Sequence, residues 1–337
     1  MKTRLSFSVN DLAETRFAIS PMWEVVTSFR ALAAAEVPGP HRGWAAQVRP
    51  RLAAAGLDRG WLADMIPPIG HLPDFLNPTS PTASPGLSDE LAAVEATDPE
   101  QVRRDLDHLA AEREGRLSLR LRNLHRTPWV YLPRIVTEIE DYWRLAIAPY
   151  WARIRSLLEA DLFHRGRQVA EHGTAQALDE LHPTVRWANG SLHLVERHCA
   201  ITRIETGAGL LLVPSVFAWP RVLTRSIVSE PPQLAYPARG IGTLWQRRTH
   251  AHMESLAAVI GRSRALLLAE LDAPASTTEL AHRSGLSAAG VSQHLTALRA
   301  AGLTSTHRAG RSVLYARTGL AEALLLGDAV VDAGSDR

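Results

Sequence analysis

The most constraining feature of this sequence is the stretch 262–317, where local signals mark where helices begin and end. Leucines recur at spacings of three and four from Ser263 to Leu271, which is typical of a packed amphipathic helix, and Pro274 then ends it. Ser276 with Glu279 three residues later has the pattern of a capping box at the start of the next helix. The pattern predicts two helices separated by the Pro-containing turn.

A tight turn and a further helix follow. Gly285 stands where a helix ends in a left-handed residue, and Ser287 can cap the next helix. Val291, Leu295 and Leu298 recur at i, i+4 and i+7, so they face inward. The opposite face carries short or polar groups, which can hydrogen-bond base edges or phosphates in a major groove without steric bulk. These outward residues are Ala289, Ser292, Gln293, Thr296 and Arg299.

The last part of the stretch predicts a β-hairpin, because TSTHR and RSVLYAR are two short strands about a Gly-containing turn. We expect His307, Arg308 and Arg311 at its tip, where they can contact phosphates or a minor groove. The predicted DNA-binding residues of the whole stretch are Ser287, Ala289, Ser292, Gln293, Thr296, Arg299, His307, Arg308 and Arg311.

The run LSAAGVSQHLTALRAAGL followed by RAGRSVLYAR resembles the ArsR family of bacterial winged-helix regulators, over about 243–331 with the flanking helices. The resemblance implies a winged helix-turn-helix that binds double-stranded operator DNA as a homodimer built by its two outer helices. Two-fold symmetry would present two recognition helices one DNA turn apart. Phrases such as RFAISPMWE and LHPTVRW resemble an uncharacterised domain that precedes such winged helices in regulators of G+C-rich bacteria. That second resemblance supplies an architecture and no ligand.

The chain departs from the metal-sensing members of that family. Those members carry Cys-x-Cys where this chain has Ser276 and Thr278, and hydroxyls are poor ligands for zinc, arsenite or cadmium. The family's other site needs Asp and His on the last helix, and here Asp328 and Asp332 follow the last His, His307. We therefore expect no metal at either family site, and no cofactor.

Composition describes an ordinary globular protein, with 46% hydrophobic and 21% charged residues. A single cysteine, Cys199, excludes an internal disulfide framework and fits a reducing cytoplasm. The chain has neither a signal-peptide pattern nor a long apolar run, so we expect no membrane association. The pI of 9.0 reflects arginine usage, but 241–317 holds nine arginines against four acids, and this local excess would attract phosphate.

The first 240 residues predict an α+β domain, with helices first and strands after. We expect a strand at Arg4–Val9, helices within 12–19 and 21–35, and charged helices over 89–114. A long periodic helix covers 133–166 and is broken or kinked at Pro149. From Val185 onward, short runs such as SLHLV, AITRIET, GLLLVPSVFAW, RVLTRSIV and LAYPAR predict four or five strands of one sheet. The predicted domains are 1–240 and 241–331.

Other groupings favour structural roles. His250 and His252 point apart on a helix, and His193, His198 and Cys199 lack a second cysteine for a zinc site. The adjacent acids Glu138, Glu140 and Asp141 are typical of a solvated helix face. The chain has no nucleophile elbow, Walker loop or dinucleotide fingerprint.

Three hypotheses follow from the sequence. The first is a cytoplasmic transcriptional regulator, a repressor and not an enzyme, whose first domain binds a small apolar effector. The second is a DNA-binding protein controlled by a protein partner or acting architecturally, without a small-molecule ligand. The third is an enzyme with a DNA-binding tail, which would need titratable groups converging in one pocket of the first domain.

Overall fold

The computed structural model describes residues 3–6, 9–188, 191–194, 202–203, 209–227, 230–245, 253–309 and 312–326. The chain divides into two compact units. The first comprises 1–142 and 157–241, and the second comprises 143–156 and 242–337. The boundary at 241/242 lies one residue from the predicted 240/241, and the segment Trp143–Ser156, expected in the first domain, groups with the second unit.

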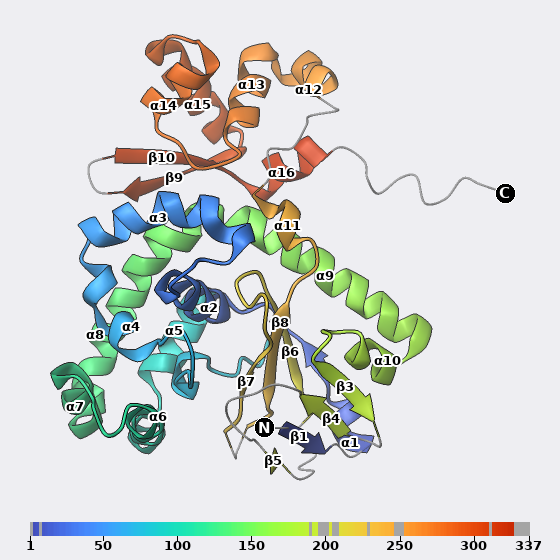
Figure 1. Ribbon diagram of the computed structural model, residues 1–337. Helices are drawn as coiled ribbons and strands as arrows, with labels where there is room; N and C mark the ends of the chain where they lie inside the picture. The colour runs from blue at the N-terminus through green and yellow to red at the C-terminus, as the bar shows by residue number, and fades with distance from the viewer. Residues whose placement is uncertain are drawn as a thin grey trace. The chain divides into compact units, whose positions relative to one another are not determined.

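Helices supply most of the first unit (Figure 1). Ser20 caps α2 by accepting a hydrogen bond from the Trp23 amide at 3.1 Å, and Pro21 occupies the first turn. The helices of this unit are α1 (Val9–Ala13), α2 (Pro21–Ala33), α3 (Arg42–Ala54), α4 (Trp61–Met65), α5 (Leu87–Glu95), α6 (Pro99–Glu112), α7 (Leu119–Arg126), α8 (Pro128–Tyr142), α9 (Trp151–His172, from Leu157 onward) and α10 (Thr174–Asp179). Short 3₁₀ turns η1 (Gly39–His41), η2 (Leu57–Arg59) and η3 (Asp74–Leu76) connect some of them.

Two four-stranded sheets complete the first unit. One has the order β3-β4-β1-β5, with β1 (Thr3–Ser6), β3 (Val185–Ala188), β4 (Ser191–Leu194) and β5 (Thr202–Arg203). The other has the order β2-β6-β8-β7, with β2 (Arg16–Phe17), β6 (Leu211–Ser215), β7 (Leu223–Arg225) and β8 (Gln233–Pro237). In the second sheet β2, β6 and β8 are parallel, and only β7 is antiparallel. The buried strand β6 is apolar from Leu211 to Pro214, as expected for a parallel strand covered on both faces.

The mixed helix and sheet composition predicted for the chain is confirmed, and each of the five apolar runs after Val185 contains a strand. They belong to two sheets rather than one, because early strands join them. The helix predicted within 12–19 is wrong at Arg16 and Phe17, which form β2. Long-range pairing decides this: Ala18 donates its amide hydrogen to the Leu212 carbonyl oxygen at 3.0 Å. The predicted strand at Arg4–Val9 ends at Ser6, and Val9 begins α1.

The predicted break near Pro149 is confirmed. After α8 the chain forms a π-helical turn, η4 (Trp143–Ile147), and a 3₁₀ turn, η5 (Ala148–Tyr150), before α9 begins at Trp151. Proline lacks an amide hydrogen and cannot continue the helix ladder. These two turns belong to the second unit.

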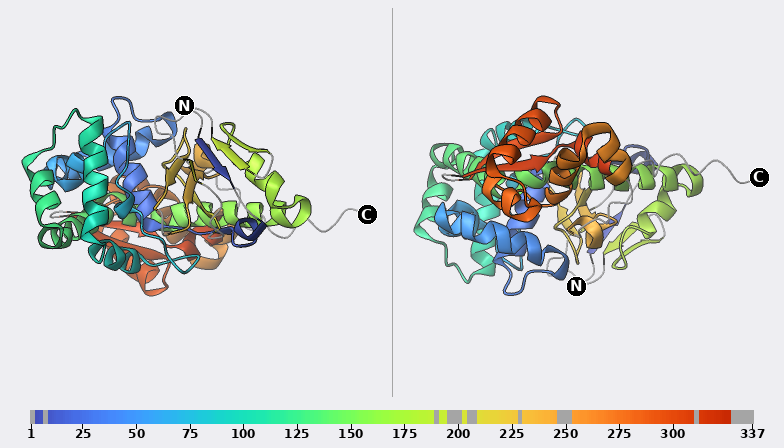
Figure 2. Two further views of the ribbon diagram at one scale, coloured as in Figure 1. Left: turned by 90° about the horizontal axis from the view of Figure 1, so that it is seen from below. Right: turned by 90° about the horizontal axis from the view of Figure 1, so that it is seen from above.

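The second unit also contains short helices and one antiparallel hairpin (Figures 1 and 2). Its core is a cluster of buried leucines, alanines and one valine from α12 to α16, among them Leu267, Leu280 and Leu295. The elements are α11 (Ile241–Leu244), α12 (Met253–Ile260), α13 (Arg262–Glu270), α14 (Thr277–Ser284), α15 (Ala288–Ala300), β9 (Thr304–Ala309), β10 (Ser312–Arg317) and α16 (Gly319–Leu326).

Within the described ranges, no helix combines the length and the apolar composition needed to cross a bilayer.

Candidate nucleic-acid interface

The turn between α14 and α15 is built by the local signals that the sequence carries. Ser276 Oγ accepts the Glu279 amide hydrogen, and Glu279 Oε2 accepts the Ser276 amide hydrogen at 2.7 Å, so the predicted capping box is confirmed. Gly285 ends α14 with φ +71°, and Ser287 Oγ accepts the Gly290 amide hydrogen at 3.2 Å to begin α15. The two helices therefore meet through a tight glycine turn, as predicted.

Packing fixes which face of α15 is available to a partner. Val291, Leu295 and Leu298 are at most 1% exposed and belong to the core of the second unit. Because successive residues of a helix are about 100° apart, the other side of α15 faces solvent. The predicted contact residues of α15 and its cap are all exposed: Ser287, Ala289, Ser292, Gln293, Thr296 and Arg299.

One of these side chains is partly engaged by its own helix. Thr296 Oγ1 donates its hydrogen to the Ser292 carbonyl oxygen at 2.9 Å. Its hydroxyl oxygen keeps lone pairs that can accept a hydrogen bond, whereas the Gln293 amide offers both a donor and an acceptor. Gln293 can therefore make a bidentate contact with the edge of an adenine, and the guanidinium of Arg299 on the same face can do so with a guanine.

The predicted contact residues of the hairpin differ in how exposed they are. Arg308 is exposed on β9, opposite Val313. His307 is half-buried beside it, and its Nε2 pairs with Ser305 Oγ at 2.9 Å. Burial lowers the pKa of His307, so at neutral pH it carries no positive charge with which to attract a phosphate. Arg311, also predicted as a contact, lies outside the described residues.

Each face of the hairpin packs against a different part of the second unit. Tyr315 packs on the helical core, and its backbone pairs with Ala275 in an antiparallel bridge. Leu314 and Ala316 alternate with Tyr315, so they lie on the other face, and both are buried outside the helical core cluster. Both strands contact η5, and β9 also contacts η4. The segment Trp143–Tyr150 therefore covers the side of the hairpin that the helices leave open.

This covering segment adds a basic residue that sequence reasoning missed. Arg144 is exposed, and its Nη1 donates a hydrogen bond to the Arg308 carbonyl oxygen at 2.9 Å. Farther along, Arg153 Nη1 donates to the Asp272 carbonyl oxygen at 3.0 Å, which fastens the start of α9 to the turn after α13. Arg144 is far from Arg308 in sequence, so no motif could have joined them.

A buried arginine anchors the end of the hairpin. Arg317 donates hydrogen bonds to the Leu268 and Ala269 carbonyl oxygens at the end of α13. Its guanidinium lies 3.4 Å from the Glu322 carboxylate, and both side chains are at most 5% exposed. Breaking such a buried pair typically costs about 3–5 kcal/mol. Arg317 is therefore structural, whereas the side chains of Arg308 and Arg144 are exposed.

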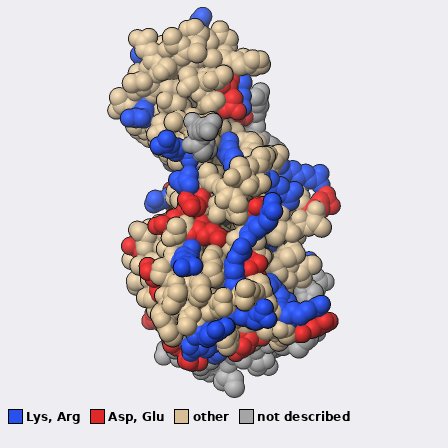
Figure 3. Space-filling model, turned by 90° about the vertical axis from the view of Figure 1, so that its left-hand side faces the viewer, with Lys and Arg blue, Asp and Glu red and all other residues tan. Residues whose placement is uncertain are grey.

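Charge is mixed over the one face of the molecule that Figure 3 shows. Figure 3 shows basic and acidic side chains interspersed over the visible face. The uppermost part of that view is mostly uncharged, with separate basic groups.

The outer helices of the second unit expose apolar side chains. Val259 on α12 is 82% exposed, and Leu320 and Leu324 on α16 are 56% and 41% exposed. Leu320 and Leu324 are four residues apart, so they share one face of α16, and α16 contacts α12. These are the helices at which the family resemblance implies a dimer contact.

The prediction that Glu138 belongs to a solvated helix face is wrong, because its side chain is half-buried and has a structural role. The Glu138 carboxylate accepts the amide hydrogens of Trp61 and Leu62, both at 2.8 Å, and so caps α4. Of the predicted histidine and cysteine groupings, His193 lies on β4, and His198, Cys199, His250 and His252 lie outside the described residues.

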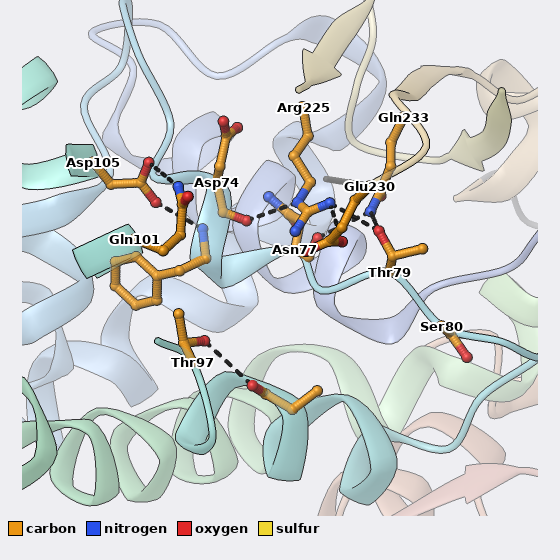
Figure 4. A network of polar contacts seen from close by, with 12 residues as sticks. Asp74, Asn77, Thr79, Ser80, Thr97, Gln101, Asp105, Arg225, Glu230 and Gln233 are labelled. Carbon is orange, nitrogen blue, oxygen red and sulfur yellow. Dashed lines mark hydrogen bonds and ion pairs between the residues drawn. The ribbon is translucent and has the colours of Figure 1, made fainter. Parts of the chain in front are cut away.

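A buried network joins the segment after η3 to the sheet of the first unit (Figure 4). Arg225 Nη1 donates to Glu230 Oε2 at 2.7 Å and to Thr79 Oγ1 at 2.8 Å. Gln233 Nε2 donates to Thr79 Oγ1 at 2.9 Å and to the Asn77 carbonyl oxygen at 3.1 Å. The segment 67–86 is thus held against β7 and β8, and Phe75 and Leu76 within it are buried.

Comparison with known proteins gives one match. Residues 93–242 match the model of a family described as a family of unknown function (DUF5937). The match covers less than half of the chain and ends before α12. No curated protein and no solved structure matches the chain.

Proposed function

We propose that the chain is a DNA-binding transcriptional regulator whose second unit is a winged helix-turn-helix of ArsR type. α14 and α15 correspond to the helix-turn-helix, with α15 as the recognition helix, and β9–β10 is the wing. The observation that carries the proposal is the exposed, small and polar face of α15, which follows a glycine turn and precedes a hairpin bearing Arg308. A helix of this kind fits a major groove, and the hairpin is placed for the neighbouring backbone.

Arg144 extends the proposed wing contact. Its guanidinium donates to the Arg308 carbonyl oxygen, so the two exposed arginines lie at the same edge of the hairpin. Two cations there would bind adjacent phosphates and release their counterions. The proposed base contacts are Gln293, Ser292 and Thr296, and Arg299 also lies on this face.

We further propose that the regulator acts as a homodimer. Val259, Leu320 and Leu324 supply exposed apolar surface on α12 and α16, the helices from which the resemblance implies a dimer. A dimer doubles the recognition helices and predicts a pseudo-palindromic operator with half-sites one turn apart. The protein would act in the bacterial cytoplasm as a repressor without the family metal sites. A small apolar effector bound by the first unit stays a prediction.

The test is fluorescence anisotropy with labelled duplexes from the DNA upstream of its own gene and with random duplexes, over a range of salt. Arg308→Ala should weaken binding to every duplex and reduce the salt slope by about one ion. Gln293→Ala should cost about 1–3 kcal/mol of discrimination at one base position and leave the salt slope unchanged.

Arg122→Ala is the matched control, since Arg122 is an exposed arginine on α7 of the first unit. It should bind like the unmodified chain. Equal losses for Arg122→Ala and Arg308→Ala, or no preference for upstream over random DNA, would contradict the proposal.

A further inference from the structure

Two histidines and one aspartate of the first unit face one another. His71, Asp105 and His108 each offer one ligand atom, and these three atoms all lie within 4.8 Å of one another. Asp105 and His108 are three residues apart on α6, so they share one face of that helix. His71 comes from the segment before η3, and its Nε2 lies 3.9 Å from Asp105 Oδ1.

The backbone brings His71 to α6 by a close approach. The His71 amide donates to Glu112 Oε2 at 2.8 Å, and Arg30 Nη2 donates to the Gly70 carbonyl oxygen at 2.8 Å. Gly70 has φ +105°, and a side chain there would collide with the Glu112 carboxylate. The glycine thus lets the segment lie against the end of α6, and the position of His71 is set by the fold.

Asp105 is oriented by neighbours on both of its oxygens (Figure 4). Its Oδ2 accepts the Phe75 amide hydrogen at 2.8 Å, and its Oδ1 accepts a hydrogen from Gln101 Nε2 at 2.9 Å. Gln101 is itself held, because Arg104 Nη2 donates to its Oε1 at 2.9 Å. Each carboxylate oxygen can accept a second partner, so Oδ1 keeps a lone pair toward His71. Metal-binding carboxylates are typically held by hydrogen bonds of this kind.

The burial of His71 bears on one of its two ring nitrogens, Nε2. His71 Nε2 is buried and makes no hydrogen bond among the described residues. A buried polar atom left without a partner typically costs about 1–3 kcal/mol. The exposed ring of His108 lies beside it, with the two ring centroids 5.2 Å apart and the rings perpendicular. A bound cation would satisfy the lone pair that the fold otherwise leaves unused.

We propose that His71, Asp105 and His108 form a binding site for a divalent transition-metal ion, of which Zn²⁺ fits best. Two imidazole nitrogens and one carboxylate oxygen are a ligand set of open zinc sites, which leave a coordination position for water or another ligand. Bonds of about 2.0–2.2 Å place tetrahedral ligand atoms about 3.3 Å apart. The present spacing reaches that value if the His71 and Asp105 atoms, now 3.9 Å apart, approach by about 0.6 Å and the exposed His108 side chain moves toward them.

The site shares no residue with the proposed DNA contact, and the sequence predicts no metal here. Its only local signal is the Asp-x-x-His spacing of Asp105 and His108, which alone is common on helix surfaces. His71 lies far earlier in the chain. The hydrogen bonds of His71 with Glu112 and of Gly70 with Arg30 bring the third ligand into place.

The experiment uses the untagged full chain, stripped of metal by a chelator, and titrates it with Co²⁺ while recording visible absorption. We expect one Co²⁺ per chain, with a ligand-field spectrum that Zn²⁺ abolishes by competition. His108→Ala and Asp105→Asn should each weaken Co²⁺ binding by at least about tenfold. His108 is exposed, so its replacement leaves the core intact. Asparagine keeps the shape of Asp105 but only one of its two acceptor oxygens, so circular dichroism checks that this variant is folded.

His172→Ala is the matched control, because His172 is also an exposed helical histidine, at the end of α9. It should bind Co²⁺ like the unmodified chain. The proposal is overturned if the unmodified chain takes up no stoichiometric Co²⁺. Unchanged affinity in both His108→Ala and Asp105→Asn would also overturn it, because the bound metal would then lie elsewhere.

Discussion

The two units differ in how the sequence specifies their structure. Short-range contacts set the helices of the second unit, and long-range contacts set the sheets and polar clusters of the first. In the second unit, Ser276 with Glu279, Gly285 and Ser287 set helix ends through contacts within four residues. In the first unit, Gly209 lies against the backbone of Glu14, and Glu24 accepts a hydrogen bond from the amide of Val216, which is 192 residues later in the chain. Short-range sequence signals therefore specify the helices of the proposed DNA contact. The contacts of the first unit instead form between residues far apart in the chain, so they depend on the tertiary fold.

The largest loss of stability should come from replacing a glycine of the first unit, Gly209. Gly209 has φ +74°, and a side chain there would collide with the backbone carbonyl of Glu14. Gly209→Ala should lower the free energy of unfolding of the first unit by about 2–5 kcal/mol, from the left-handed backbone and from overpacking together. Faster hydrogen exchange of amides in β6 and β8 would measure the loss. A loss below about 1 kcal/mol would show that this close approach is not needed.

A buried carboxyl should make the first unit sensitive to pH. Burial raises the pKa of Glu24 to about 8, although hydrogen bonds from Ser215 and Val216 oppose the shift. The folded state then holds a proton that the unfolded state releases above its pKa of about 4.5. The free energy of unfolding should therefore fall as pH rises toward 8, by about 1 kcal/mol per unit from this group.

The window from pH 6.5 to 8 contains this titration and that of Asp105, whose pKa burial raises to about 7, so comparison with Glu24→Gln is needed to separate them. Burial lowers the pKa of His41 to about 4, so that histidine is neutral throughout the window. Glu90, whose pKa burial raises to about 7, contributes in the same direction. Glu24→Gln should flatten the slope of stability against pH, measured by chemical unfolding at several pH values. An unchanged slope in this variant would place the titration elsewhere.

The smallest loss of stability should come from replacing Gly285 in the second unit. Gly285 has φ +71°, but a side chain there would meet open space. Gly285→Ala should thus cost only the backbone energy, about 1–2 kcal/mol. Gly319→Ala is the control, since Gly319 begins α16 with open space and no positive φ, and alanine there should stabilise by about 0.4–1 kcal/mol. If hydrogen exchange shows the same loss of stability for Gly285→Ala and Gly209→Ala, the proposed difference between the two units is wrong.

The same contrast explains what the sequence could predict. Helix caps, the left-handed Gly285 and the inward positions of α15 follow from short-range rules, and the structure has them as expected. The strand Arg16–Phe17 was mistaken for helix, because its partner Leu211–Leu212 lies far along the chain.

The candidate sites divide in the same way. The exposed face of α15 could be predicted, whereas the half-buried state of His307 depends on which face of the hairpin is covered. The contact of Arg144 with Arg308 and the grouping of His71 with Asp105 depend on tertiary approach, which no spacing rule encodes.

The most direct test of the central claim is hydroxyl-radical footprinting of the full chain on the DNA upstream of its own gene. The account predicts two protected segments related by a pseudo-two-fold axis and centred about 10 base pairs apart. Gln293→Ala should weaken protection of that site without changing binding to random DNA. Uniform protection along the duplex, or protection that Gln293→Ala and Arg308→Ala both leave intact, would contradict α15 as a recognition helix.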